Sequence, residues 1–228
     1  MSNSVVVSLS GGMDSTTLLA WCLKEYAVIH AVSFQYPSKH GTLENQAVMR
    51  IEDHYTLSVK WISLKNVFRH FKSNLLLGQG EIPEGHYESE SMKQTVVPGR
   101  NMIFASILAG YAESVGSLDV VLGVHAGDHA IYPDCRPPFI DAMGQAIRMA
   151  TDEGVYLKAP FILKNKTSIL AWGLKHNVPY HLTRTCYSEQ QVACGKCGSC
   201  QERLEAFKNN GVEDPIEYES REILPKGK

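Results

Sequence analysis

Residues 10–15 combine groups that can bind phosphate, because they read Ser-Gly-Gly-Met-Asp-Ser. The two glycines tolerate positive φ and let a ligand approach the backbone closely. A helix that began here would offer unpaired N–H groups and the positive end of its dipole to an anion. The hydroxyls of Ser10, Ser15 and Thr16 could donate as well. The stretch is a candidate anion site, and the alternative is an ordinary strand-to-helix turn capped by Asp14 or Ser15.

Four cysteines late in the chain have the spacing of a metal site. They follow the pattern C-x7-C-x2-C-x2-C and are Cys186, Cys194, Cys197 and Cys200. Four thiolates this close match a tetrahedral zinc site, and an iron–sulfur cluster also uses four cysteines. Since cysteines fill all four positions, no coordination position stays open, and we expect a structural metal. Cys22 and Cys135 are isolated and lie outside this pattern.

Polar side chains also gather in two loops that follow apolar, strand-like runs. The first loop carries Tyr36, Lys39 and His40, which we expect to reach over a bound nucleotide. The second carries His125, Asp128, His129, Tyr132, Asp134, Cys135 and Arg136. We interpret the second as a substrate-binding loop, because a carboxylate accepts from base N–H groups and an arginine pairs with a carboxylate. The alternatives are ordinary loops, a metal held by the two histidines and Asp128, and a nucleophilic Cys135.

Two cations stand where a helix dipole disfavours them. Arg100 follows Pro-Gly at the start of one apolar helical run, and Lys166 stands at the start of another. Positive charge at a helix N-terminus is unfavourable unless an anion lies nearby. Both residues are therefore candidate phosphate ligands. A simple turn at the first position and a solvated lysine at the second are the alternatives.

The elements that must position these residues alternate along the chain. Strands are predicted at 5–9, 29–34, 58–64, 119–123 and 155–158. Helices are predicted at 15–24, 43–55, 67–76, 101–115, 139–151, 166–176 and 198–209. This alternation predicts a parallel sheet covered on both faces, which binds ligands at the carboxyl ends of its strands. The glycine loop follows the first strand, so it lies at the expected place.

Residues 77–98 form the longest stretch without periodicity. They include three glycines, two prolines and several acidic residues. A loop of this length is uncommon within a domain, and such loops are often lids. We expect a mobile cover over the active site, with simple disorder as the alternative.

Composition limits the classes of function. With 228 residues, 44% of them hydrophobic, the chain can bury a full α/β core and a modest appendage. A net charge of −2 gives no basic face for duplex nucleic acid. There is no long apolar run and no secretory signal pattern, so we expect no membrane span and a cytoplasmic location. Clustered cysteines in such a reducing compartment favour metal over disulfides.

Together these segments resemble the 7-cyano-7-deazaguanine synthases, the queuosine-pathway branch of the ATP pyrophosphatases, or PP-loop enzymes. The resemblance runs from about residue 5 to residue 207. Besides the glycine loop it rests on Pro-Gly-Arg-Asn at 98–101, Gly-Val-His-Ala-Gly-Asp-His at 123–129, Tyr-Pro-Asp-Cys-Arg-Pro at 132–137 and the four cysteines. The glycine loop alone indicates the superfamily, whereas the last two features are specific to this branch.

The resemblance implies a fold and a reaction. The fold is adenine nucleotide alpha-hydrolase-like: a doubly wound, mainly parallel five-stranded sheet with helices on both faces. Residues 1–180 would form the PP-loop domain, and 181–228 a zinc-knuckle and helical segment packed on it. In the reaction, the carboxylate of 7-carboxy-7-deazaguanine attacks the α-phosphate of ATP, and ammonia displaces AMP to give the amide. A second ATP activates the amide oxygen, and loss of AMP leaves the nitrile.

The resemblance also implies roles for individual residues, with magnesium bridging the phosphates and zinc as the structural metal. Catalytic roles go to Ser10, Asp14, Ser15 and Lys166. ATP-binding roles go to Leu9, Ser10, Gly11, Gly12, Met13, Asp14, Ser15, Thr16, Thr17, Leu18, Leu19 and Arg100. Substrate-binding roles go to Lys39, His40, His125, Asp128, Tyr132, Asp134 and Arg136. The expected partners are these small molecules, with no nucleic acid and no membrane, and a homodimer is a possible assembly.

Two places depart from the family pattern. Pro37 follows Tyr36 where many relatives carry glycine, and Pro137 and Pro138 stand where an acidic residue is frequent. These departures leave open the substrate contacts and a product that stops at the amide. A PP-loop enzyme that acts on tRNA and a zinc-knuckle binding module without catalysis also stay open. The lack of basic surface disfavours the tRNA enzyme, and the intact glycine loop disfavours the binding module.

Overall fold

A five-stranded, all-parallel sheet forms the centre of the computed structural model, which describes residues 3–225. The strand order is β3-β2-β1-β4-β5. The strands are β1 (Ser4–Ser8), β2 (Val28–Gln35), β3 (Val59–Ser63), β4 (Asp119–Val121) and β5 (Tyr156–Lys158). All five predicted strands are confirmed, and so is the doubly wound α/β class.

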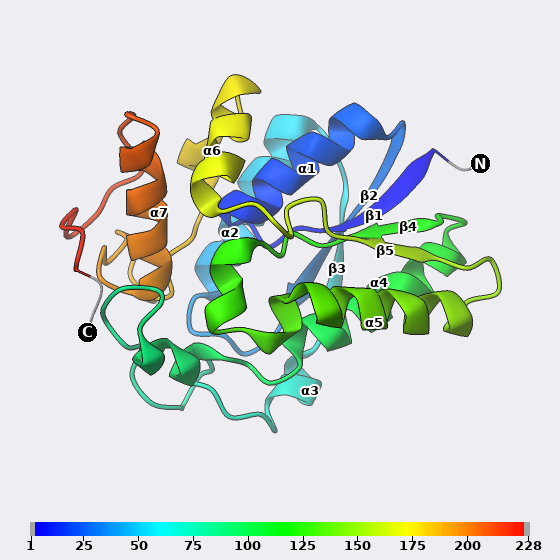
Figure 1. Ribbon diagram of the computed structural model, residues 1–228, viewed down its shortest axis with the longest axis horizontal. Helices are drawn as coiled ribbons and strands as arrows, with labels where there is room; N and C mark the ends of the chain where they lie inside the picture. The colour runs from blue at the N-terminus through cyan, green and yellow to red at the C-terminus, as the bar shows by residue number, and fades with distance from the viewer. Residues whose placement is uncertain (1–2, 226–228) are drawn as a thin grey trace.

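Helices cover both faces of this sheet (Figure 1). One face carries α1 (Met13–Glu25), α2 (Gly41–Tyr55) and α6 (Lys166–Lys175), and the other carries α4 (Arg100–Ser114) and α5 (Pro137–Ala150). Successive side chains of a strand point to opposite faces, so the apolar run of β1 serves two cores. Val5 and Val7 pack in the core of the first face, and Val6 packs in the core of the second.

The strand order determines where a ligand can bind. The chain starts in the central strand, winds to one edge through β2 and β3, and crosses to β4 on the other side of β1. The carboxyl ends of β1 and β4 therefore form the switch point of the sheet, where a crevice opens between diverging connections. The glycine loop leaves β1 at this point.

The last helix, α7 (Gly198–Asn209), has the bounds that the sequence predicts and packs against α6. It begins within the cysteine cluster. Its Arg203 is fully buried and pairs with Asp214, with Nε 2.6 Å from Oδ2 and Nη2 2.8 Å from Oδ1. This bidentate pair attaches the segment after α7 to the helix.

The predicted helix at 67–76 is wrong. Only Lys65–Phe68 is helical, as α3, and the chain then turns. Leu75 and Leu76 are nevertheless buried in a hydrophobic cluster. Their backbone, however, pairs with the loop after β2: Lys39 N donates to Leu75 O at 2.9 Å, and Leu76 forms a β-bridge with the same loop. Tertiary pairing overrides the local helical pattern here.

Residues 77–98 are folded, not structureless. They include a 3₁₀ helix, η1 (Glu90–Thr95), and pass below α7 in Figure 1. Gly85 N donates to Lys196 O at 2.9 Å, and Glu84 forms a β-bridge with Cys197. The segment is thus attached to the cysteine loop and not disordered, and the expected mobile cover over the active site stays a prediction.

This attachment predicts that metal removal loosens residues 77–98. Trypsin cleavage at Lys93, the one lysine or arginine of the segment, should be slow in the purified protein and at least about tenfold faster after chelation, because cleavage follows local opening. Mass spectrometry of the fragments measures it, and cleavage at the exposed Lys72 serves as the reference. Unchanged cleavage at Lys93, or an equal increase at both sites, would contradict the coupling.

Candidate active site

A cavity of about 210 Å³ lies at the switch point. Its walls come from the glycine loop, from the loops after β2 and β4, and from the first turns of α4, α6 and α7. Of the glycine-loop region, the lining residues are Leu9, Ser10, Gly12, Met13, Asp14 and Ser15. The sequence also predicted ATP contacts at Gly11, Thr16, Thr17, Leu18 and Leu19, but these are buried beneath the loop and do not line the cavity.

The glycine loop presents free donors to this cavity. The N-cap residue of α1 is Gly12, which has no side chain that could cap the helix. The predicted caps Asp14 and Ser15 lie inside the helix and do not cap it. The N–H groups of the first turn therefore have no intrahelical acceptor and no side-chain cap. Ser15 Oγ accepts from Ser10 N at 3.2 Å and lies 3.1 Å from Ser10 Oγ, so the two hydroxyls are held together.

Gly11 shows why the loop needs glycine. Its φ is +79°, and a Cβ at this position would lie 2.9 Å from both Ala47 Cβ and Glu44 O. A side chain here would therefore meet both backbone strain and the wall of α2. The tight approach of loop and helix fixes the position of the N–H donors.

The buried side chains of Lys166 and Glu202 lie beside Asp14 of the loop. Lys166 Nζ lies 2.5 Å from Glu202 Oε2 and 3.3 Å from Asp14 Oδ2. Lys166 is 5% exposed, so it is not a solvated lysine. Burial opposes the charge of Lys166, but Asp14 and Glu202 outweigh it and raise the Lys166 pKa. Burial likewise opposes the charge of Asp14, yet Lys166 and His125 hold the Asp14 pKa well below its usual range.

His125 extends this group of ions. Its Nε2 lies 3.6 Å from Asp14 Oδ2 and 3.5 Å from Asp128 Oδ2. Burial alone would lower the pKa of His125, but the carboxylates of Asp128 and Asp14 outweigh it and raise that pKa to about 9. His125 is therefore cationic at neutral pH, and such a histidine is a poor metal ligand.

The sequence-predicted metal alternative of His125, Asp128 and His129 does not form. The structure groups Glu202 with His125 and Asp128, with one ligand atom of each within 4.8 Å of the others. Since His125 is protonated, its ring cannot ligate a metal ion, and Glu202 is already paired with Lys166.

The end of the cavity near β2 is built differently. Arg100 Nη1 donates to Tyr36 Oη at 3.2 Å, and His40 Nε2 lies 3.5 Å from Glu44 Oε2. Burial lowers the pKa of His40 to about 3 and raises that of Glu44 to about 8. At neutral pH these two side chains are uncharged, so the positive charge at this end comes from arginine.

The four cysteines form a cluster that could bind a metal ion. Their Sγ atoms all lie within 4.8 Å of one another, with Cys186 3.5 Å from Cys194 and Cys194 4.0 Å from Cys200. A zinc tetrahedron with Zn–S bonds of about 2.3 Å needs S···S distances of about 3.8 Å. Backbone N–H groups also point at the sulfurs: Ser188 N lies 3.4 Å from Cys186 Sγ, and Cys197 N lies 3.4 Å from Cys194 Sγ. Such donors stabilise thiolates, the form that binds metal.

Comparison with known proteins identifies the family. Residues 4–211 match the family described as "Queuosine biosynthesis protein QueC". The chain belongs to the QueC family. It is 46% identical to 7-cyano-7-deazaguanine synthase 1 of Colwellia psychrerythraea, covering 96% of this chain and all of that protein. It is 47% identical to 7-cyano-7-deazaguanine synthase of Marinobacter nauticus, covering 96% and 99%.

The fold of this QueC family member also resembles a solved structure of low sequence identity. The NMN synthetase from Francisella tularensis aligns with a TM-score of 0.52 and 13% identity, covering 93% of this chain and 79% of that one. At this identity the likeness concerns the fold alone, and it agrees with the parallel sheet. Within the described part of the chain, no helix is both long and apolar enough to cross a membrane.

Three residues that the sequence predicts as substrate contacts lie outside the cavity of this QueC protein. Lys39 Nζ donates to Gly80 O at 2.6 Å. Asp134 Oδ2 accepts from the N–H of Asn101 at 2.9 Å, so it caps the start of α4. Arg136 Nε donates to the backbone carbonyl of His129 at 2.7 Å. The predicted substrate contacts His40, His125, Asp128 and Tyr132 do line the cavity, and so does Lys166, which was predicted to be catalytic.

Cys135 lines the cavity but is unsuited to nucleophilic attack. Burial raises the pKa of its thiol, so the thiolate is disfavoured. The side chain accepts from Asn101 Nδ2 at 3.2 Å. The structure thus supports a packed thiol over the nucleophile.

Sequence reasoning missed two charged residues of the site, Glu202 and Arg184. Both are at most 7% exposed and line the cavity. Each lies two positions from a cluster cysteine, Cys200 and Cys186 respectively. The sequence feature that could have indicated both residues is therefore their proximity to a cluster cysteine. A metal bound by the cysteines would fix the direction of the neighbouring backbone.

Arg184 joins two parts of the site. Its backbone N–H donates to Gly11 O at 2.8 Å. Its guanidinium donates to carbonyls of the cysteine loop, at 2.8 Å to Ser188 O, 2.7 Å to Gln190 O and 2.8 Å to Gln191 O. One residue therefore holds the glycine loop and the cysteine loop together.

Proposed function

We propose that this chain converts 7-carboxy-7-deazaguanine and ammonia into 7-cyano-7-deazaguanine through adenylated intermediates. Two ATP are cleaved to AMP and pyrophosphate for each product. The observation that carries the proposal is the glycine loop at the switch point, with the buried Lys166–Asp14 pair facing it. The names of the relatives at 46% and 47% identity, both 7-cyano-7-deazaguanine synthases, support the substrate.

The loop would hold the pyrophosphate that leaves ATP. Negative charge grows on this group as the bond to the α-phosphate breaks, and the uncapped N–H groups of the first turn of α1 belong to residues that line the cavity. Donors fixed before the reaction stabilise such charge without reorganisation. Ser10 and Ser15 would add hydroxyl donors, and Lys166 would add a fixed positive charge at the same wall.

Asp14 fits a role in holding magnesium. Its Oδ1 is buried and has no hydrogen-bond partner among residues 3–225. Mg²⁺ prefers carboxylate and phosphate oxygens. When bound, the ion supplies charge neutralisation on the phosphates. Asp14 would orient the polyphosphate chain through this oxygen, while Oδ2 stays with Lys166 and His125.

We propose zinc as the metal of the four cysteines, with a structural role. The support is the sulfur-only donor set and the near-tetrahedral S···S distances. Ser199 and Glu202 in the first turns of α7 line the active site, so the metal would fix that wall. The reduced thiols that such a site needs suit the cytoplasm.

The decisive experiment is mass spectrometry of the product formed from the carboxylate, ATP and ammonium without RNA. We expect the nitrile, with two pyrophosphates released for each molecule. Accumulation of the amide alone would assign a shorter reaction. No turnover by the metal-loaded protein would overturn the proposal and favour a tRNA-directed enzyme or a non-enzymatic binding module.

The glycine loop makes the first mutational prediction. Ser15→Ala removes a hydroxyl that is held beside Ser10, and turnover should fall about 10²-fold, the usual cost of losing one preorganised donor. The pyrophosphate release rate measures it, and circular dichroism checks the fold. Lys24→Ala, in the last turn of the same helix, is the matched control with wild-type rates expected. Wild-type turnover in Ser15→Ala would remove this hydroxyl from the mechanism.

A further inference from the structure

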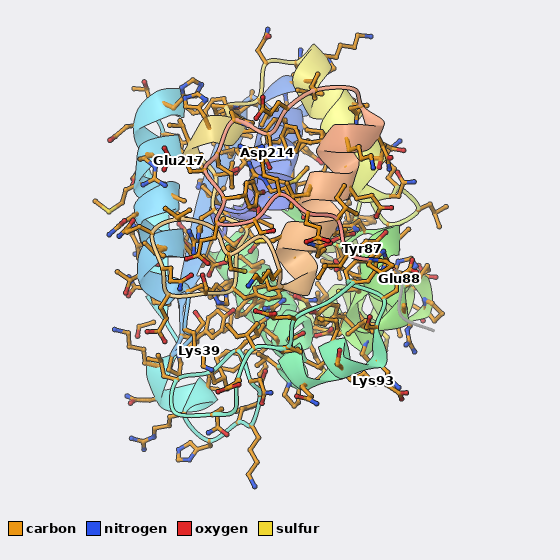
Figure 2. The ribbon with its side chains drawn as sticks, turned by 90° about the vertical axis from the view of Figure 1, so that its left-hand side faces the viewer. Lys39, Tyr87, Glu88, Lys93, Asp214 and Glu217 are labelled. Atoms are coloured by element: carbon orange, nitrogen blue, oxygen red, sulfur yellow. The ribbon has the colours of Figure 1, made fainter. Side chains whose placement is uncertain are left out.

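A second, smaller cavity adjoins the active site. Its volume is about 20 Å³, room for one molecule of the size of water. It shares Asp128, Ser199 and Glu202 with the large cavity and continues to Tyr87 and Met92 of the anchored segment 77–98. Figure 2 shows Tyr87 beside the N-terminal turns of α7, on the face of the molecule that this helix forms. The small cavity therefore lies between that face and the reaction site.

The polar side chains of this cavity carry oxygen and no nitrogen. Its lining residues are Tyr87, Met92, Gly127, Asp128, Ile131, Tyr132, Tyr187, Gly198, Ser199 and Glu202. No lysine, arginine or histidine is among them. Carboxylates only accept hydrogen bonds when ionised, and hydroxyls can accept as well as donate. The cavity therefore suits a small guest that is rich in donors.

Glu202 has one oxygen to offer such a guest. The residue is 7% exposed, and its Oε2 is bound to Lys166. Its Oε1 faces Gly127 at the wall of the small cavity. A carboxylate oxygen there can accept a hydrogen bond from a guest that donates.

Gly127 keeps the space for this oxygen. A Cβ at position 127 would lie 2.2 Å from Glu202 Oε1 and 3.0 Å from His125 Cε1. Any larger residue would push the carboxylate out of its place. Gly127 thus leaves room for Oε1, and Lys166 holds the other oxygen of the same carboxylate.

The charges around the cavity leave room for one more cation. The carboxylates are Asp14, Asp128 and Glu202, and the cations are Lys166 and His125. Three carboxylates thus lie beside two cationic side chains in this group, so acceptor oxygens that attract a cation are in excess.

We propose that this small cavity binds the ammonium ion that supplies the nitrogen of the amide: after it passes a proton to a bordering carboxylate, the ammonia formed attacks the adenylated carboxyl carbon, and the bond to AMP breaks. Ammonium has four N–H donors, no acceptor, one positive charge and the size of water, which matches the wall, the charge and the volume. A hydrated magnesium ion keeps several waters and would not fit in about 20 Å³. The inference rests on the proposed function, because only the amidation step consumes ammonia.

The test uses substitutions that narrow the small cavity at residues that do not line the larger, active-site cavity. Met92→Phe and Ile131→Phe each add bulk to the small cavity alone. We expect the KM for ammonium to rise about tenfold or more, equivalent to roughly 1.4 kcal/mol of lost binding, at saturating ATP and carboxylate. Met92→Leu conserves the volume and should keep the wild-type KM. An unchanged ammonium KM in both folded phenylalanine variants would overturn the site.

The amide substrate separates this inference from the proposed function. Conversion of the amide to the nitrile needs ATP but no ammonium, so the phenylalanine variants should convert the amide at near wild-type rates. Slowing of this step by the same factor as the full reaction would indicate general damage or a metal site, and would overturn the ammonium assignment. If wild-type protein converts neither the carboxylate nor the amide, the proposed function itself fails.

Potassium provides a second measurement on unaltered protein. It has the charge of ammonium and nearly its size, so it should compete with ammonium in the first reaction and leave amide conversion unaffected. Competitive inhibition by potassium chloride, with sodium chloride at equal ionic strength as the control, supports a charged-ion site. Equal effects of the two salts would contradict it.

Discussion

Replacing Lys166 with methionine should abolish turnover and destabilise the protein by about 3–5 kcal/mol, the usual cost of removing one partner of a buried ion pair. Lys166 lies between Asp14 and Glu202, and its loss leaves the buried Glu202 and the partly exposed Asp14 without their shared cation. One of them would then bind a proton, and the field at the glycine loop would change. Urea unfolding gives the stability, and the rate of pyrophosphate release gives the activity.

A double variant distinguishes the loss of stability from the loss of activity. Lys166→Met combined with Glu202→Gln removes one charge of each sign, so much of the lost stability should return. Activity should not return, because the fixed positive charge at the phosphate wall is still missing. Lys166→Arg keeps that charge and should retain more stability than Lys166→Met. Full activity in Lys166→Met, or a double variant less stable than it, would contradict this account of the pair.

Cys197→Ser should lose bound zinc and unfold at a temperature lower by about 10 °C or more. Zinc binding by four thiolates contributes many kcal/mol to folding, and each kcal/mol shifts the midpoint by about 2–4 °C in a chain of this size. Activity should fall as well, since the first turns of α7 form a wall of the active site. Elemental analysis and thermal unfolding of the same preparations measure both effects.

The matched control is Cys22→Ala, which removes a buried thiol far from the cluster in sequence. It should keep one zinc per chain and show only a modest loss of stability. Iron with a visible absorption band, or a fully active wild-type preparation without metal, would contradict the zinc assignment. Equal zinc content in Cys197→Ser and wild type would remove Cys197 from the ligand set.

Local chemistry explains what the sequence could predict. The β-branched run of β1 and the two glycines after it determine a strand, a turn and a helix start among neighbours in the chain. The cysteine spacing likewise predicts the metal cluster from residues that are close in the chain. Lys166 was recognisable because its charge opposes the helix dipole, although the anions beside it are Asp14 and Glu202 of the protein itself.

The remaining features depend on partners far apart in sequence. Asp134 appeared to be a substrate ligand, but its carboxylate caps α4 through Asn101 N, a contact that spacing does not indicate. The segment 67–76 has helical periodicity, yet its end pairs with the loop after β2. Glu202 lies on a helix whose direction the cysteine cluster sets, so its place at the active site emerges only in three dimensions.

The bonds of Arg184 make the two ends of the site thermodynamically dependent on each other. Its N–H holds the glycine loop at Gly11, and its guanidinium holds the cysteine loop at three carbonyls. Whatever rigidifies one loop lowers the entropy that the other must lose on binding. By reciprocity, the factor by which the metal strengthens nucleotide binding is also the factor by which the nucleotide strengthens metal retention. An enzyme at work would thus hold its metal more tightly than one without substrate.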